Sequence, residues 1–247
     1  MTANRPVRPR SVERALAYPY DVPERSYVIH AGEVSDVGCD GCLGDLSDRT
    51  PVLAVGSNQS PSALAWKFSL PEDGPVPVVR VRLKDFDSVY CAHFAGYGSV
   101  PATLHQAPGT TVTLFVNWLN AAQLARMHET EIRRGNYVYG HLDGVEMETE
   151  FGPKLTRIGM YLATFGALTL DGSPVALAEV KAEGRRHPAL GQRDLLARLV
   201  ARIAPDVSIE DFVQRNMDDE AERLRRRESL LASALTWADP RFTPARP

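Results

Sequence analysis

The stretch LAVGSNQSPSAL, residues 53–64, places a polar corner between an apolar run and the start of a helix. The apolar run 53–55 is typical of the end of a buried strand, and Gly56 allows the chain to turn sharply. Ser60 followed by Pro61 is the usual pairing of an N-cap with a first helical residue, so a helix is predicted to begin there. The corner is therefore predicted to join a strand to a helix.

The same corner has the composition of an anion-binding turn. The first N–H groups of a helix have no partner within the helix, and they attract carboxylate or phosphate groups. Gly56 permits a close backbone approach, while Ser57 and Asn58 add a hydroxyl and an amide. Because these residues are also common in strand-to-helix turns for conformational reasons, the corner alone leaves both interpretations open: a binding site and a simple connection.

The composition is that of an ordinary globular chain. Its 247 residues are 44% hydrophobic and 24% charged, and 28 basic against 31 acidic residues give a net charge of −3. This charge gives no reason to expect binding to nucleic acid, and the basic runs 5–10 and 223–227 are interpreted as solvated faces. No run approaches the roughly 18 apolar residues of a membrane span, and none resembles a signal peptide. We therefore expect a cytoplasmic protein that binds neither nucleic acid nor membranes.

The three cysteines do not indicate a disulfide framework. Cys39 and Cys42 have C-x-x-C spacing within the glycine-rich segment 38–45, and Cys91 lies apart in a strand-like run. A zinc site needs two further ligands, and the sequence has no second C-x-x-C and no H-x-x-x-H. We interpret the segment as a loop with incidental spacing, and a metal or redox site at Cys39 and Cys42 is the alternative.

The hydrophobic pattern divides the chain into three parts. Residues 1–48 are predicted to be an irregular N-terminal extension with one strand candidate, 26–31. Residues 49–185 are dominated by strand patterns, and residues 186–247 form a helical C-terminal extension. The predicted strands are 76–83, 86–94, 111–119, 157–165 and a hairpin at Asp171-Gly172 within 167–180. This order predicts an α+β fold with a mixed or partly closed sheet as its core.

Helical patterns cover four segments. Asn120 is the predicted N-cap of the first helix, and Gly135 lies just past its end. Ser208 and Asp211 form a capping pattern at the start of the third. The four predicted helices are 120–134, 193–203, 208–217 and 220–238.

Helical geometry separates two glutamates of the first helix. Leu124, Met127 and Glu131 are spaced i, i+3 and i+7, so Glu131 lies on the apolar stripe that should face the sheet. Glu129 falls on the opposite face, four residues before Arg133, which predicts an exposed ion pair. Glu131 is thus the carboxylate expected to be partly desolvated.

A partly desolvated carboxylate can act as a general acid or base. The sequence therefore makes Glu131 a candidate catalytic residue. In the alternative, Glu131 is a structural residue paired with Arg134 or with an arginine of the sheet.

The order of these motifs resembles the gamma-glutamylcyclotransferase-like family. That family has an aromatic-Gly-Ser-Asn loop after a short strand, then a glycine-rich segment, a Pro-Gly turn, an apolar strand, and a helix with the catalytic glutamate shortly before a tyrosine. The resemblance covers roughly residues 51–140. The matching segments are AVGSN (54–58), GYGSVPATL (96–104), APGTTVTLFVNWL (107–119) and HETE (128–131) followed by Tyr137.

The resemblance implies a small mixed β-barrel with helices outside it, and a pocket between the loop and the glutamate. Gly56, Ser57 and Asn58 would bind the gamma-glutamyl part of a small-molecule substrate. Glu131 would move a proton from the substrate α-amino group to the departing amine, releasing 5-oxoproline. Tyr137 would orient the glutamate or line the pocket. The resemblance implies no metal and no organic cofactor.

Several residues depart from the family pattern. Val55 replaces an aromatic residue, Gln59 replaces an aliphatic residue, and Ile132 replaces a glycine, so the pocket wall is expected to differ. His128 stands where the family often has an aspartate, and there it could hydrogen-bond Glu131. These departures keep a second hypothesis open: a non-catalytic module on the same fold that binds a small carboxylate, or a protein partner through the helices after residue 190. The sequence leaves the oligomeric state open, homo-oligomers included.

Overall fold

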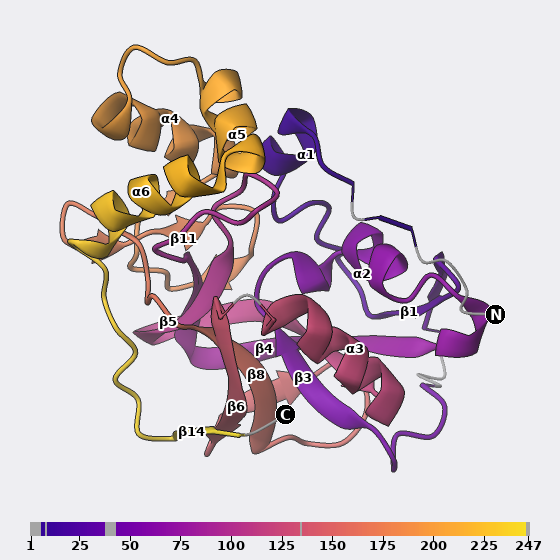
Figure 1. Ribbon diagram of the computed structural model, residues 1–247. Coiled ribbons are helices and arrows are strands. Elements are labelled where there is room, and N and C mark those ends of the chain that lie inside the picture. Colours follow the sequence, from indigo (N-terminus) through magenta and orange to yellow (C-terminus); the bar gives the residue numbers. More distant parts are fainter. Residues whose placement is uncertain (1–5, 8, 38–42, 134, 246–247) are drawn as a thin grey trace.

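The computed structural model describes residues 6–7, 9–37, 43–133 and 135–245. Its architecture is α+β, with one large mixed sheet and a group of C-terminal helices, as predicted (Figure 1). The helices α4, α5 and α6 gather at one end of the molecule, where α1 packs against α5 (Figure 1). None of the described helices is long and apolar enough to cross a membrane.

Helices and strands are each numbered in the order in which they occur along the chain. The helices are α1 (Val12–Leu16), η1 (Ser57–Gln59), α2 (Pro61–Lys67), η2 (Pro71–Asp73), α3 (Ala121–Glu131), α4 (Gln192–Ile203), α5 (Ile209–Asp218) and α6 (Glu220–Leu231). The strands are β1 (Tyr27–His30), β2 (Glu33–Asp36), β3 (Thr50–Ala54), β4 (Val76–Tyr90), β5 (Ala102–Leu119), β6 (Tyr137–Asp143), β7 (Met147–Thr149), β8 (Arg157–Ala163), β9 (Thr169–Leu170), β10 (Ser173–Pro174), β11 (Ala176–Leu177), β12 (Ala182–Glu183), β13 (Ala189–Leu190) and β14 (Phe242–Pro244).

The main sheet is open rather than closed. Its strand order is β13-β11-β4-β5-β3-β8-β6-β14, with parallel pairs β3/β8 and β11/β13 among antiparallel neighbours. Among the strand pairings of the described residues, none joins the two end strands into a ring. The end strands β13 and β14 have two and three residues, so they offer few backbone groups for pairing. The mixed sheet is confirmed, and the strands of the described residues do not close into the small β-barrel implied by the resemblance.

Two predicted strands merge into β4. The runs 76–83 and 86–94 form one strand that ends at Tyr90, with an irregularity between Lys84 and Phe86. Asp85 adopts a φ of 66° there, which is typical of a β-bulge. The bulge lets one long strand bend with the sheet. In the sequence, the residues of the bulge interrupt the strand pattern, which is why two separate strands were predicted.

The predicted hairpin and helix caps are confirmed. Asp171 and Gly172 have φ values of 51° and 80°, and they connect β9 to β10. Asn120 caps α3 by accepting a hydrogen bond from the Gln123 amide, and Ser208 caps α5 in the same way. Helix α6 ends at Leu231 instead of continuing to residue 238.

The terminal parts pack against the same core as the sheet. Leu195, Phe212 and Leu230 of the C-terminal helices belong to the hydrophobic cluster that includes the inner residues of β4 and β5. Near the N-terminus, β1 pairs with β4. The boundaries near residues 48 and 185 stay a prediction.

Candidate functional site

One cavity brings together the residues that the sequence singled out. It has a volume of about 470 Å³. We call it the corner cavity, because residues 56–58 of the strand-to-helix corner form part of its wall. Its wall includes all five predicted site residues: Gly56, Ser57, Asn58, Glu131 and Tyr137.

The corner itself is a short 3-10 turn that leads into α2. The Gln59 amide donates to the Gly56 carbonyl at 3.1 Å, and the Ser60 amide donates to the Ser57 carbonyl at 3.0 Å. Helix α2 begins at Pro61, as predicted. The Gln59 and Ser60 amides, which precede the helix, are therefore used within the corner and do not face the cavity as unpaired donors.

Gly56 is required by a contact within the protein. A Cβ at this position would lie 2.1 Å from the Tyr18 hydroxyl oxygen and 2.9 Å from the Ala102 Cβ. The Tyr18 hydroxyl accepts a hydrogen bond of 2.9 Å from the Ala102 amide, and Tyr18 also lines the corner cavity. The close approach predicted at Gly56 is thus made by Tyr18, a residue of the N-terminal part that sequence reasoning did not select.

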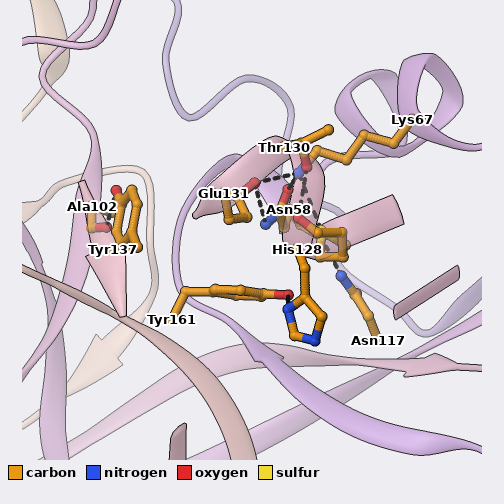
Figure 2. A network of polar contacts seen from close by, with 10 residues as sticks. Asn58, Lys67, Ala102, Asn117, His128, Thr130, Glu131, Tyr137 and Tyr161 are labelled. Atoms are coloured by element: carbon orange, nitrogen blue, oxygen red, sulfur yellow. Dashed lines mark hydrogen bonds and ion pairs between the residues drawn. The ribbon is translucent and has the colours of Figure 1, made fainter. Parts of the chain in front are cut away.

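Glu131 is held by a lysine and an amide. The Lys67 ammonium forms an ion pair with the Glu131 Oε1 atom and also donates to the Asn58 Oδ1 atom at 2.8 Å. The Asn58 Nδ2 atom lies 3.3 Å from the same Glu131 oxygen. Figure 2 shows this triangle of side chains, which come from α2, the corner and α3. The corner and the catalytic candidate are therefore in direct contact.

The cation in this triangle differs from the one expected. Sequence reasoning considered Arg134 or an arginine of the sheet, whereas the partner seen is Lys67 of α2. Arg134 lies outside the described residues. The Lys67 side chain is 3% exposed and the Glu131 side chain is 19% exposed, so Glu131 is partly buried as predicted. A neighbouring cation stabilises the charged form of a carboxylate, and it opposes the effect of burial.

Glu129 lies on the exposed face of α3, as predicted. Its side chain is 65% exposed, and its Oε2 atom lies 2.9 Å from the Arg126 Nη1 atom. The ion pair is therefore made with Arg126, three residues earlier, instead of with Arg133. Both glutamates line the corner cavity, but Glu131 is partly buried and paired with Lys67, whereas Glu129 is largely exposed.

Tyr137 lines the cavity but points its hydroxyl at the backbone. The hydroxyl donates to the Ala102 carbonyl at 2.9 Å and lies 3.5 Å from the Cys91 sulfur. Burial raises the pKa of Tyr137 well above its ordinary value, so the group is a neutral donor. In Figure 2 the Tyr137 ring lies apart from the triangle of Glu131, which leaves lining the cavity as the role that its position supports.

His128 makes a different contact from the one expected. Its Nδ1 atom lies 2.8 Å from the Tyr161 hydroxyl, and its ring packs edge-on against Tyr139. The predicted hydrogen bond to Glu131 is therefore replaced by one to Tyr161. Tyr161 lines the corner cavity, and burial together with the nearby Glu131 charge raises its pKa. The sequence offered no signal for Tyr161 beyond its place in a strand.

The three departures from the family pattern have different positions. Val55 lines the corner cavity, whereas Gln59 and Ile132 are not among the described lining residues. Gln59 is fully buried, and its side-chain amide donates to the Gly56 carbonyl at 3.3 Å. Of the three departures, only Val55 therefore changes the described cavity wall. Gln59 instead stabilises the corner through its buried hydrogen bond to Gly56.

Cys39 and Cys42, the residues of the alternative metal or redox site, lie outside the described residues. Cys91 is a buried thiol, and burial raises its pKa. In the part of the chain that the structure describes, no three His, Cys, Asp or Glu side chains cluster as metal ligands do.

Comparison with known proteins finds similarity among solved structures. No protein-family model matches the chain, and no curated protein matches it. Among solved structures, the chain is similar to a gamma-glutamyl cyclotransferase with 17% identity and a TM-score of 0.38, over 77% of this chain and 90% of that chain. It is also similar to an uncharacterized protein from Homo sapiens with 16% identity and a TM-score of 0.39, over 78% of this chain and 93% of that chain.

Proposed function

We propose that this chain is a gamma-glutamylcyclotransferase-like enzyme that cleaves a gamma-glutamyl amide into 5-oxoproline and an amine or amino acid. The observation that carries the proposal is the contact between Asn58 and Glu131, 3.3 Å apart in the wall of one cavity. A substrate-binding corner and a proton-transferring carboxylate must both reach the same molecule, and this contact supports that requirement.

The reaction needs one proton to move between two nitrogens of the substrate. In the proposed scheme, residues 56–58 hold the gamma-glutamyl part while Glu131 accepts a proton from the α-amino group. The freed nitrogen attacks the γ-carbonyl carbon, a new C–N bond closes the five-membered ring, and the original amide C–N bond breaks. Glu131 then returns the proton to the departing nitrogen, so that it ends the cycle in the state in which it began.

Ring closure within one molecule explains why so few groups are needed. Nucleophile and electrophile are already joined, and well-oriented intramolecular reactions reach very high effective molarities. Lys67 supports the scheme because an ammonium group beside Glu131 favours the ionised carboxylate, which is the form that accepts a proton. The scheme routes no step through a metal or an organic cofactor. We place the reaction in the cytoplasm.

The test is release of 5-oxoproline from a panel of substrates. Purified protein is incubated with gamma-glutamyl amino acids, glutathione and gamma-glutamyl amines, and 5-oxoproline is measured by chromatography. We expect release from at least one of them, and we expect Glu131→Gln to lower kcat/KM by about 100-fold or more. Glu129→Gln is the matched control, because it makes the same chemical change at a second, largely exposed carboxylate of the same helix and the same cavity wall.

The second candidate function is binding without catalysis. The ion pair between Lys67 and Glu131 favours it, because a carboxylate already engaged by an ammonium group can serve as a fixed part of a binding wall. In that case a small carboxylate, or a protein partner docking on the helices after residue 190, would bind without any release of 5-oxoproline. Turnover that is lost in Glu131→Gln and kept in Glu129→Gln decides for the enzyme.

A further inference from the structure

A second cavity adjoins the corner cavity beneath α6. It has a volume of about 440 Å³ and is lined by the 93–96 segment, Asn136, the end of α5, and α6. We call it the α6 cavity. The two cavities share four lining residues: Arg10, His93, Gly96 and Asn136. The two cavities are therefore neighbours along these shared residues.

His93 stands at this junction with unsatisfied polar atoms. It is 1% exposed, and neither ring nitrogen has a hydrogen-bond partner within the described part of the chain. Its ring packs edge-on against Tyr137 and Phe165, with centroids 5.9 and 5.8 Å away. Burial, with the Arg227 charge, lowers the pKa of His93 to about 3, so the ring is neutral near pH 7. A neutral ring carries one N–H donor, and buried polar atoms in folded proteins nearly always have a partner.

Arg227 supplies a second unsatisfied donor in the same wall. Its guanidinium carbon lies 4.4 Å from the centre of the Phe165 ring, the ring that also packs against His93. Its Nε atom is buried without a partner among the described residues, while Nη2 lies 3.3 Å from a carboxylate oxygen of Glu228. Arg227 and His93 therefore flank Phe165 with one unused N–H donor each.

The other charged groups of the α6 cavity are occupied. Arg223 lies 3.3 Å from Glu220, and Arg10 donates to the Met217 carbonyl. Asp218 accepts a hydrogen bond of 2.6 Å from the side-chain amide of Gln214. A cationic guanidinium and a neutral imidazole thus remain to receive a ligand, and this donor pair fits a carboxylate.

We propose that the α6 cavity is a carboxylate-binding subsite in which His93 and Arg227 hold an acidic group on the departing part of the substrate. The inference rests on the proposed function, since the corner cavity would hold the gamma-glutamyl part and only the departing part reaches past His93. It assigns the C-terminal helix α6 a role in choosing the substrate.

The test compares two substrates that differ by one carboxylate. Gamma-glutamyl-alanine and gamma-glutamyl ethylamide have the same departing carbon chain, except that the second lacks the acidic group. We expect wild-type kcat/KM to favour gamma-glutamyl-alanine by at least about tenfold, as loss of one charge-assisted hydrogen bond implies. In Arg227→Met and in His93→Phe this preference should fall severalfold towards one.

Arg225→Gln is the matched control, since Arg225 lies on the same helix, is 65% exposed and pairs with Glu222. Its substrate preference should equal that of wild type. Arg227→Lys, which keeps the charge, should give an intermediate preference, and it serves if Arg227→Met does not fold. Melting temperatures accompany every variant, because a merely structural role for His93 or Arg227 would change stability without changing the preference.

The outcomes separate this inference from the proposed function. Release of 5-oxoproline with no preference for the acidic substrate, or with a preference that both variants retain, overturns the subsite and keeps the enzyme. If wild type releases nothing, the proposed function fails. Calorimetric binding of the same two compounds then tests the carboxylate-binding subsite by itself. Tenfold tighter binding of gamma-glutamyl-alanine that Arg227→Met removes then supports the subsite, whereas equal binding or no binding overturns it.

Discussion

Two buried pairs of a carboxylate and a cation lie in different regions of this molecule and are built differently. In the sheet, Arg185 donates to both oxygens of Asp87, with Nε–Oδ2 and Nη2–Oδ1 distances of 2.9 Å. The Asp87 Oδ1 atom also accepts from the Ser88 amide at 2.9 Å, and the side chain is 0% exposed. Such two-point pairing fixes the geometry of the carboxylate and excludes water from it.

The pair in the corner cavity has neither property. Lys67 and Asn58 both reach the same oxygen of Glu131, and a lysine is a point charge without the fork of an arginine. The Glu131 side chain is 19% exposed and forms part of a cavity wall. Burial and ion pairing alone therefore do not identify a catalytic carboxylate. A carboxylate suited to proton transfer must also face a cavity in which a ligand fits.

The largest expected effect is on the sheet pair. Asp87→Ala should lower the free energy of unfolding by about 3–5 kcal/mol, because it leaves a buried guanidinium and the Ser88 amide without their acceptor. Urea unfolding measures the change. The double variant Asp87→Leu with Arg185→Met should recover much of the loss, since it removes both charges. A loss below about 1 kcal/mol in Asp87→Ala would mean that the pair does not hold the fold.

The next effect lies in the wall of the corner cavity. Gly56→Ala should destabilise the fold by about 1–3 kcal/mol, because its Cβ would lie 2.1 Å from the Tyr18 hydroxyl oxygen. Tyr18→Phe removes this oxygen, so the double variant should lose less than the sum of the two single variants. Additive losses in thermal or urea unfolding would show that the crowding at Gly56 has another origin.

What could be predicted from the sequence was set by local patterns. The Asn120 cap, the hairpin at Asp171-Gly172 and the exposed face of Glu129 each depend on residues within a few positions of one another. A repeating apolar pattern also predicted that Glu131 is partly buried. These features need no knowledge of how distant elements meet.

The remaining features join distant parts of the chain. Lys67 lies 64 positions from Glu131, Tyr18 lies 84 from Ala102, and Arg185 lies 98 from Asp87. No local pattern selects these partners, because many lysines, tyrosines and arginines would serve equally well until the sheet brings particular ones together. The sequence pattern left open whether the sheet is partly closed for a related reason, since closure depends on whether the end strands reach each other.

Lys67→Met tests the cavity pair directly, with a smaller effect on stability. We expect a loss of less than about 2 kcal/mol, because Glu131 keeps its contact with Asn58 and can turn towards the cavity. The acidic limb of the pH profile of kcat/KM should move to higher pH, since removal of a cation makes protonation of a carboxylate easier. A structural role for Lys67 alone would lower stability and leave this limb in place.

The smallest effect is expected for Glu129→Gln. Its ion pair with Arg126 is exposed, and such pairs contribute about 0.2–1 kcal/mol. Arg126 also lies 5.6 Å from the centre of the Trp66 ring, a contact that the substitution leaves intact. The melting temperature and the release of 5-oxoproline should therefore both stay close to wild type.

Glu129→Gln is the reference against which the loss of catalysis in Glu131→Gln is measured. Glu129→Gln and Glu131→Gln remove the same charge from the same helix, two positions apart, so helix propensity and net charge cancel between them. Any difference in catalysis then reports only the side of the helix on which the carboxylate lies. If Glu129→Gln were the variant that abolished release, the proton carrier would be the exposed carboxylate beside Arg126, and the triangle of Glu131 with Lys67 and Asn58 could not be the reaction site.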